Sequence, residues 1–132
     1  MRLIEAEGGD GQWHNIQMMN DTGSDIMKIF DSDFAMLGNL SDYDPVSDWV
    51  LISDANGFQQ PRQRIFVEVQ LARGIDDEWG PSFLEAGVIY PDGLGIPRLT
   101  GLGLRLNFFI GTAPDFTYLA VACTKSGMSS LL

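Results

Sequence analysis

The chain is poor in cysteine and in positive charge. Its 132 residues include one cysteine, Cys123, so no disulfide can form within the chain. Eight lysine and arginine residues stand against eighteen aspartate and glutamate residues, which gives a formal net charge of −10. Such a surface repels the phosphates of nucleic acids and the headgroups of anionic lipids. We therefore expect neither nucleic acid nor a membrane as a partner.

Long apolar runs are also missing. The N-terminus lacks the basic start and continuous apolar stretch of a secretory signal, and no run approaches membrane-spanning length. A cytoplasmic location is the default expectation. Asn20-Asp21-Thr22 and Asn39-Leu40-Ser41 would be glycosylation sequons in a secreted protein, so the sequence alone leaves the compartment open.

Repeats, low-complexity tracts and linkers are absent as well, and with 45% apolar residues the chain can bury a core. We expect a single domain over residues 1–132. Fifteen glycines and six prolines separate short apolar runs, which favours strands joined by tight turns. The sequence therefore predicts an all-β, mostly antiparallel fold with one short helix. The expected strands cover residues 14–20, 25–30, 49–52, 65–71, 83–90, 102–110 and 118–124.

Two local patterns place the helix and a hairpin. Asp31 or Ser32 can cap a helix of one or two turns, and Gly38 suits a left-handed stop. Asn56-Gly57 lies between apolar strands, and both residue types accept positive φ at little cost. The sequence therefore predicts a short helix after the second strand and a tight hairpin after the third.

The tetrapeptide Asp21-Thr22-Gly23-Ser24 is the most informative motif. Asp-Thr-Gly followed by Ser or Ala arises by chance in roughly one chain of this length in a few hundred, given residue frequencies of a few per cent. Here it occurs once, between two apolar segments, ahead of the predicted helix and the Asn-Gly hairpin. Each of these features, in this order, is expected of one protein family.

Over residues 13–106 the chain resembles the retropepsin-like aspartic proteases, the dimeric single-lobe relatives of pepsin. The resemblance implies an acid-protease half-barrel in which Asp21 is the catalytic residue. It further implies that Thr22 bonds across the dimer, that Gly23 allows close backbone approach, and that Ser24 belongs to the same supporting loop.

The same resemblance assigns residues around the turn. Asp25 would contact the substrate main chain and an arginine, either Arg98 or Arg105. The segment Leu99-Thr100-Gly101 would pass beneath the turn. Two residues depart from the family pattern because they are polar where an apolar side chain is usual: Asn20 and Thr100.

Two further regions complete the resemblance. The hairpin at Asn56-Gly57-Phe58 would be the flap that closes over a bound peptide and excludes water. Residues 107–132 extend beyond the usual length of the family. This extension has strand character, and it could contribute to dimerisation in place of the family's terminal strands.

A chain with a single Asp21 supplies half an active site, so the resemblance requires a homodimer with one carboxylate from each copy. Two carboxylates a few ångströms apart cannot both ionise cheaply, so the pair holds one proton between them. The ionised carboxylate acts as a base toward a shared water, while its protonated twin acts as an acid toward the peptide carbonyl. The expected substrate is an extended, largely apolar peptide, and the chemistry needs no metal or other cofactor.

Several alternatives stay open, including an ordinary turn and a non-catalytic dimeric β module of the same fold that binds peptide or protein. Asp31 and Asp33 superficially resemble the Asp-x-Asp of haloacid-dehalogenase phosphatases, which depend on magnesium, although Ala35 stands where a threonine is expected. His14 and Cys123 could in principle form a thiol protease, but the apolar flanks of Cys123 are typical of a buried, inert thiol.

Overall fold

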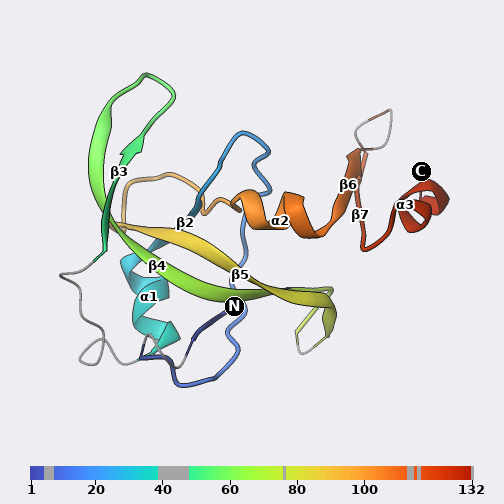
Figure 1. The fold of residues 1–132 in the computed structure, drawn as a ribbon, viewed down its shortest axis with the longest axis horizontal. Helices are drawn as coiled ribbons and strands as arrows, with labels where there is room; N and C mark the ends of the chain where they lie inside the picture. Colours follow the sequence, from blue (N-terminus) through green and yellow to red (C-terminus); the bar gives the residue numbers. More distant parts are fainter. Residues whose placement is uncertain (5–7, 39–47, 76, 113–114, 116, 132) are drawn as a thin grey trace.

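The computed structural model describes residues 1–4, 8–38, 48–75, 77–112, 115 and 117–131. The protein is mostly β, with 43% strand and 17% helix. A mixed five-stranded sheet forms the body, a separate two-stranded hairpin follows it, and over the described residues the sheet does not close into a barrel. In Figure 1 the hairpin and the last helix lie at one end of the molecule, beyond α2.

The helices and strands follow one another in a simple order. They are β1 (Arg2–Leu3), β2 (Met27–Phe30), α1 (Asp31–Leu37), β3 (Trp49–Ser53), β4 (Gln59–Ala72), β5 (Glu78–Tyr90), α2 (Leu102–Asn107), β6 (Phe109–Thr112), β7 (Leu119–Ala122) and α3 (Lys125–Leu131). None of the helices that the structure describes is long and apolar enough to cross a membrane.

The long strands β4 and β5 form the centre of the sheet. They run antiparallel, with Ile65 opposite Gly87 and Val67 opposite Glu85. β1 and β3 pair with β4 in antiparallel fashion, whereas β2 pairs with β5 in parallel. The predicted period of two in β4 is confirmed, since Ile65 and Val67 are fully buried.

Two apolar clusters fix the helices on the sheet. The main core lies between the sheet and α1, and its members include Leu3, Met27, Ile29, Phe34, Leu37, Ile65, Val67 and Ile89. A smaller cluster joins α2 to β5 through Phe83, Leu104 and Phe108. Burial of apolar surface contributes roughly 25 cal/mol per Å². The packing of these clusters therefore determines where both helices lie.

The helix α1 forms where it is predicted but begins differently. Neither Asp31 nor Ser32 caps it, because Phe30 is the last residue before the helix and donates its N–H to the Asp33 carboxylate at 3.0 Å. Arg98 donates two hydrogen bonds to the same carboxylate, at 2.7 and 2.8 Å. Asp33 is only 1% exposed. It therefore links α1 to the chain beyond β5.

Gly38 ends α1 where its backbone passes close to Gly8 and Gly9. It does not adopt the predicted left-handed conformation, so that part of the prediction is wrong. Its φ is 176°, which is extended backbone. Gly38 pairs with Gly9, and a Cβ on it would lie 2.7 Å from the carbonyl oxygen of Gly8. The predicted loop after Gly38 and the sequon at Asn39 fall on residues 39–47, outside the described residues.

The predicted strand over residues 102–110 is wrong in its first part, because Leu102–Asn107 forms α2 and β6 begins at Phe109. The leucines at 102, 104 and 106 alternate as they do in a strand, yet only Leu104 is buried. The Glu85 carboxylate accepts the free N–H groups of Gly103 and Leu104 in its first turn, which stabilises the start of the helix. With α3, the described residues contain three short helices where one is expected.

Residues 14–20 do not form the predicted strand either. One isolated bridge joins Met19 to Leu99, and His14 donates its backbone N–H to the Met1 carbonyl at 2.8 Å. Between these two anchors the segment crosses a cavity, so no described strand lies beside it. The other predicted strands and the hairpin between β3 and β4 are confirmed, with β7 shorter than expected.

The buried ion pair of Asp33 allows a stability prediction. Replacing Asp33 with Asn leaves Arg98 without its charged partner, and removing one member of a buried pair costs about 3–5 kcal/mol. Because Arg98 is 36% exposed, we expect the lower end of that range for Asp33→Asn. The exposed neighbour Asp31→Asn should change the unfolding free energy by less than about 0.5 kcal/mol. Urea denaturation of both variants measures the difference, and equal values for the two would contradict a structural role for Asp33.

Candidate active site

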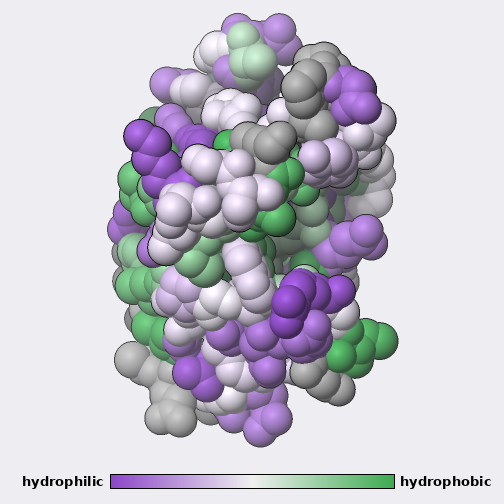
Figure 2. Space-filling view, turned by 90° about the vertical axis from the view of Figure 1, so that its right-hand side faces the viewer, coloured by the Kyte–Doolittle hydropathy of each residue, from purple (hydrophilic) through white to green (hydrophobic). Residues whose placement is uncertain are grey.

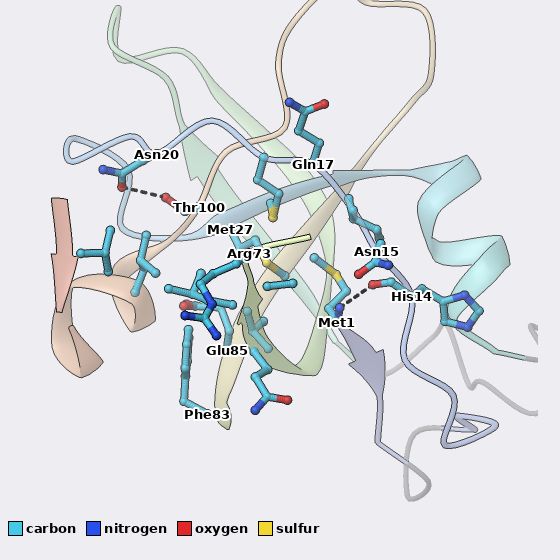
Figure 3. A pocket seen from close by; sticks show the side chains of 18 of the residues that line it. Met1, His14, Asn15, Gln17, Asn20, Met27, Arg73, Phe83, Glu85 and Thr100 are labelled. Carbon is cyan, nitrogen blue, oxygen red and sulfur yellow. Dashed lines mark hydrogen bonds between the residues drawn. The ribbon is translucent and has the colours of Figure 1, made fainter. Parts of the chain in front are cut away.

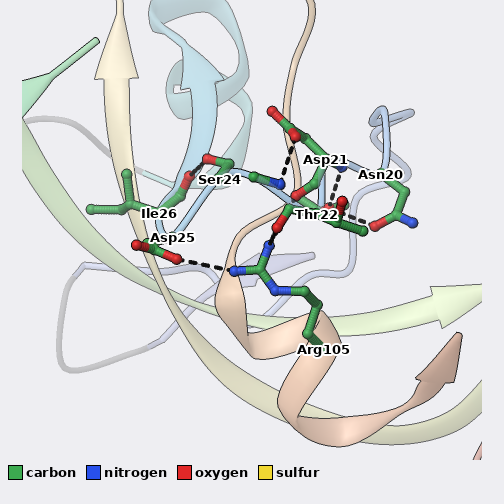
Figure 4. Close-up of polar contacts among 9 residues, drawn as sticks. Asn20, Asp21, Thr22, Ser24, Asp25, Ile26 and Arg105 are labelled. Carbon is green, nitrogen blue, oxygen red and sulfur yellow. Dashed lines mark hydrogen bonds and ion pairs between the residues drawn. The ribbon is translucent and has the colours of Figure 1, made fainter. Parts of the chain in front are cut away.

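The Asp-Thr-Gly turn is closed by hydrogen bonds of its own. Gly23 donates its N–H to a carboxylate oxygen of Asp21 at 2.9 Å, and Ser24 donates its N–H to the Asp21 carbonyl at 3.3 Å. The Ser24 hydroxyl donates to the Ile26 carbonyl at 2.7 Å. Figure 4 shows the Asp21 carboxylate on the side of the turn away from Arg105. The turn therefore orients a half-buried carboxylate from within.

The segment 98–101 runs between the two arms of this loop. Thr100 donates its N–H to the Met19 carbonyl at 3.0 Å, and Met19 donates its N–H to the Arg98 carbonyl at 2.9 Å. On the other side Lys28 donates its N–H to the Leu99 carbonyl at 2.9 Å, and Leu99 donates its N–H to the Lys28 carbonyl at 3.3 Å. Leu99-Thr100-Gly101 therefore lies against both arms of the turn, as the sequence predicts.

Gly101 is required at this crossing. A Cβ on it would lie 2.6 Å from the backbone nitrogen of Met27 and 2.8 Å from a carboxylate oxygen of Glu85. Both distances are too short for any side chain, and the backbone atom cannot move aside without disturbing β2. The crossing therefore brings two backbone segments as close together as glycine permits.

The two residues that depart from the family pattern contact each other. The Thr100 hydroxyl accepts the backbone N–H of Asp21 at 3.3 Å and donates to the Asn20 side-chain oxygen, also at 3.3 Å. All three residues are half-buried. Each polar substitution thus supplies a partner for the other, and together they bond to the backbone of Asp21.

Arg105 holds the turn from α2. Its guanidinium donates to the carbonyl oxygens of Asp21, at 3.2 Å, and of Thr22. It also donates to the carboxylate of Asp25 at 3.1 Å. Of the two arginines that the sequence offers to Asp25, the structure thus selects Arg105, since Arg98 pairs with Asp33. The Asp25 side chain is 90% exposed, so the carbonyl bonds matter more to the loop than the ion pair.

The sequence alone did not point to Glu85, whose carboxylate contacts the first turn of α2. Its side chain is buried on the inward face of β5, where Phe83, Glu85 and Gly87 alternate with the exposed Leu84 and the half-buried Ala86. An acidic residue at an inward position of a strand whose neighbouring inward positions are apolar or glycine could have identified Glu85 from the sequence. A Cβ on Gly103 would lie 2.0 Å from the Glu85 carboxylate, which therefore fills the space that glycine leaves. Through the first turn of α2, Glu85 positions Arg105.

A cavity of about 650 Å³ lies beneath the turn (Figure 3). It separates the segment 14–20 from the end of β4 and the middle of β5. Its walls are mainly apolar, and its polar members next to the turn are Asn20, Thr100 and Glu85. Asp21 does not line this cavity.

The predicted flap is a well-formed hairpin tip. The Asp54 carboxylate accepts the N–H groups of Asn56 and Phe58, both at 2.9 Å, and Gly57 has a φ of +79°. Phe58 is 62% exposed. In Figure 1 the tip and the loop after residue 20 extend toward the same side of the molecule. Within the described residues no hydrogen bond or ion pair joins Asn56, Gly57 or Phe58 to Asp21.

The remaining sequence candidates are dispersed. Cys123 is exposed, so the expected burial of its thiol is wrong, and the strand it was assigned to ends at Ala122. His14 instead lies 3.9 Å from Asp10. Asp33 is engaged by Arg98, and the part of the chain that the structure describes contains no group of three or more His, Cys, Asp and Glu side chains that could hold a metal.

The Asn20–Thr100 pair leads to a prediction on coupling. Thr100→Val leaves the Asp21 N–H and the Asn20 amide without their partner, which costs about 1–3 kcal/mol when the groups are buried and less here. In a double-mutant cycle with Asn20→Leu, we expect a coupling free energy of at least about 0.5 kcal/mol, because the double variant removes both polar groups together. Thr112→Val, at an exposed threonine, is the matched control. Additive effects in urea denaturation would show that the two residues act independently.

The pKa of Glu85 is raised because burial disfavours its charged form, although N–H bonds from Gly103 and Leu104 and the charge of Arg105 oppose the shift. A carboxyl whose pKa is higher in the folded state stabilises fully below its ordinary value of 4.5, and this contribution is lost as pH rises through the raised pKa. Because glutamine does not titrate, we expect the Glu85→Gln variant not to lose this contribution as the pH rises. The unfolding free energy of the variant, relative to the unsubstituted protein, should therefore increase between pH 4 and pH 7, and a constant difference would contradict the assignment.

Comparison of the chain with models of protein families, with curated proteins and with solved structures finds no match. The resemblance to aspartic proteases therefore depends on the motif and its order in the sequence.

Proposed function

We propose that the chain is one subunit of a homodimeric aspartic endopeptidase with an acid-protease half-barrel fold. The observation that carries the proposal is the crossing beneath the Asp-Thr-Gly turn, where Leu99 pairs with residues on both arms. A carboxylate that must meet its copy across a twofold axis needs a rigid and exposed support. The crossing, the internal bonds of the turn and the Arg105 bonds supply that support.

In the dimer the two Asp21 carboxylates share one proton and one water. The ionised carboxylate removes a proton from the water as its oxygen attacks the peptide carbonyl, and the protonated carboxylate donates its proton to the carbonyl oxygen. Collapse of the tetrahedral intermediate breaks the C–N bond, and the departing amine takes up a proton. The two carboxylates titrate as a unit, so the pH dependence of the reaction belongs to the pair.

The residues around the dyad have supporting roles. Thr22, Gly23 and Ser24 hold the loop, and Asp25, paired with Arg105, contacts the substrate main chain. The hairpin tip around Phe58 closes over an extended and largely apolar peptide. Its exposed aromatic ring and its glycine at positive φ suit a segment that moves to cover a ligand.

A non-catalytic dimeric module of the same fold is the second candidate. The polar pair of Asn20 and Thr100 favours it, because apolar side chains are usual at both positions of a working protease. A statine-type transition-state mimic discriminates between the two. Tight binding at acidic pH supports the enzyme, whereas no binding between pH 3 and pH 7 supports the module.

The substitution Asp21→Asn tests the enzyme directly. It removes the group that activates water, so we expect cleavage of a peptide library to fall by at least about 10³-fold. Circular dichroism and sedimentation should be unchanged, because the amide can still accept the N–H of Gly23. Asp31→Asn, an exposed aspartate on α1, is the control and should retain full activity. Full activity of a purified Asp21→Asn protein would end the protease hypothesis.

A further inference from the structure

We propose that the protein binds an acidic side chain of its peptide substrate at Lys28 and Arg62, here called the cation pair. Both side chains lie over the ring of Tyr90. This inference rests on the proposed function and narrows its substrate class, because the extended apolar peptide would carry a glutamate or an aspartate near the bond that is cleaved. The carboxylate of that residue would lie between the two cations.

Most cations of this acidic chain already have a carboxylate partner. Of the eight lysine and arginine side chains, five form ion pairs: Arg2 with Glu68, Arg64 with Asp48, Arg73 with Asp77, Arg98 with Asp33, and Arg105 with Asp25. Within the described residues, Lys28, Arg62 and Lys125 form no ion pair. Lys125 is exposed, whereas Lys28 and Arg62 are half-buried. The cation pair therefore consists of two partly desolvated charges for which the described chain supplies no counter-charge.

The two charges lie close together because they share one ring. Nζ of Lys28 lies 4.8 Å from the centroid of the Tyr90 ring, and the guanidinium carbon of Arg62 lies 4.6 Å from it. Their separation therefore cannot exceed the sum of these distances, 9.4 Å. The face of an aromatic ring attracts cations, but the ring has no net charge, so the two cations still repel each other. A carboxylate beside them would offset that repulsion.

Both cations have hydrogen-bond donors to offer. Over the described residues the Lys28 ammonium donates to no protein acceptor. The Arg62 guanidinium donates through Nη1 to the Pro61 carbonyl at 3.3 Å and through Nη2 to the Gln60 side-chain oxygen, but its Nε has no partner. A carboxylate has about four acceptor sites on its two oxygens, so it can accept from an ammonium and a guanidinium at once. Such charge-assisted bonds are about twice as strong as neutral ones.

The cation pair lies on the face of the sheet opposite to α1. Lys28 of β2 pairs with Val88 of β5, and Val88 pairs with Arg64 of β4. Paired residues point to the same face of a sheet, and so do residues two positions apart on one strand. Tyr90 and Arg62 are two positions from Val88 and Arg64, so they share this face with Lys28. The main core, which includes α1, lies on the other face.

The crossing beneath the turn brings the cation pair near Asp21. Lys28 exchanges backbone hydrogen bonds with Leu99, and the hydroxyl of the next residue, Thr100, accepts the N–H of Asp21. Neighbouring strands lie about 4.8 Å apart, so segments on opposite sides of a third one lie about 10 Å apart. An extended peptide covers about 10 Å in three residues. We therefore expect the acidic side chain within about three residues of the cleaved bond.

A peptide held between the hairpin tip and the turn would pass this face. Arg62 lies on β4, which leads away from the tip at Phe58. In Figure 1 the tip and the loop after residue 20 extend toward the same side of the molecule. In Figure 4, β2 leaves the turn on the side where the Asp21 carboxylate lies, and α2 lies on the other side. The strand that carries Lys28 therefore borders the space in which a peptide would reach Asp21.

The end of the molecule that carries β6, β7 and α3 offers no comparable site. Figure 2 looks onto this end and shows hydrophobic and weakly polar side chains around a hollow. Residues 108–131 contain a single basic residue, Lys125, which is exposed on α3. Because Lys125 also lacks an ion pair within the described residues, it is the matched control for the cation pair.

Binding of matched peptides to the full chain tests the inference. The probes are fluorescent apolar peptides of about ten residues that carry one glutamate or one glutamine, placed in turn within three residues of the central bond. Fluorescence anisotropy measures their affinity for the Asp21→Asn protein, which we expect to fold without cleaving them. For at least one position the glutamate peptide should bind about tenfold more tightly than the glutamine peptide. Long-range repulsion by a chain of charge −10 favours the opposite order, so the sign of the preference is diagnostic.

Variants of the cation pair identify the source of the preference. Lys28→Gln and Arg62→Gln, each in the Asp21→Asn protein, should abolish the preference for glutamate. Lys28→Arg keeps the charge and should keep the preference, as should the control Lys125→Gln. The bonds of Lys28 to Leu99 are backbone bonds, so circular dichroism should show that Lys28→Gln folds. Lys28→Gln therefore decides the question even if Arg62→Gln does not fold.

The outcomes separate the cation pair from the enzyme. A glutamate preference that is lost in Lys28→Gln but kept in Lys28→Arg and Lys125→Gln supports the inference. Equal affinity for glutamate and glutamine peptides at every position overturns it, even if the unsubstituted protein cleaves peptides. A preference that persists in folded Lys28→Gln, or no binding of either peptide, overturns it as well. A glutamate preference that depends on Lys28 in a protein that cleaves nothing supports the cation pair and counts against the proposed function alone.

Discussion

Residues 98–100 bond to two stretches of backbone that leave the Asp-Thr-Gly turn in opposite directions: Arg98 and Thr100 bond to Met19 on one side, and Leu99 bonds to Lys28 on the other. Most other features around the site depend on this double pairing. It needs Gly101, because no side chain fits between β2 and Glu85. It also needs Arg98 in place, and the buried carboxylate of Asp33 holds that arginine. The turn is thus supported by backbone bonds whose position is set from α1.

A chain of polar contacts continues from this crossing to α2. Glu85 accepts the free N–H groups at the start of the helix, and the helix carries Arg105 to the carbonyl oxygens of the turn. The first of these links supplies partners for N–H groups that have none within the helix. The loop is therefore held by groups on β5 and α2 as well as by its own hydrogen bonds.

Much of the fold follows from local patterns that one sequence contains. The alternation around Ile65 and the Asn56-Gly57 pair predict β4 and its hairpin, because period and turn chemistry are properties of neighbouring residues. The leucines from 102 to 106 mislead, because their period of two is overridden by Glu85, a residue far away in sequence. The segment 14–20 misleads for a similar reason, since a strand needs a neighbour that only the tertiary fold can supply.

The site is predictable to a similar extent. The motif identifies the turn, and the family resemblance anticipates an arginine for Asp25. The choice of Arg105 over Arg98 depends on α1, since Asp33 engages Arg98. The contact between Asn20 and Thr100 is also invisible in the sequence, where the two stand eighty residues apart and each looks like a separate departure. In the structure the two side chains form a hydrogen bond with each other.

The single Asp21 per chain has a consequence for how activity would respond to the amount of protein. An enzyme assembled from two halves has a rate that rises with the square of its concentration until dimers predominate, and linearly thereafter. Two strongly acidic chains also meet more slowly than neutral ones. Under the proposed function, dilute protein would therefore have little activity, and activity would rise where copies of the chain are concentrated locally, without any chemical signal.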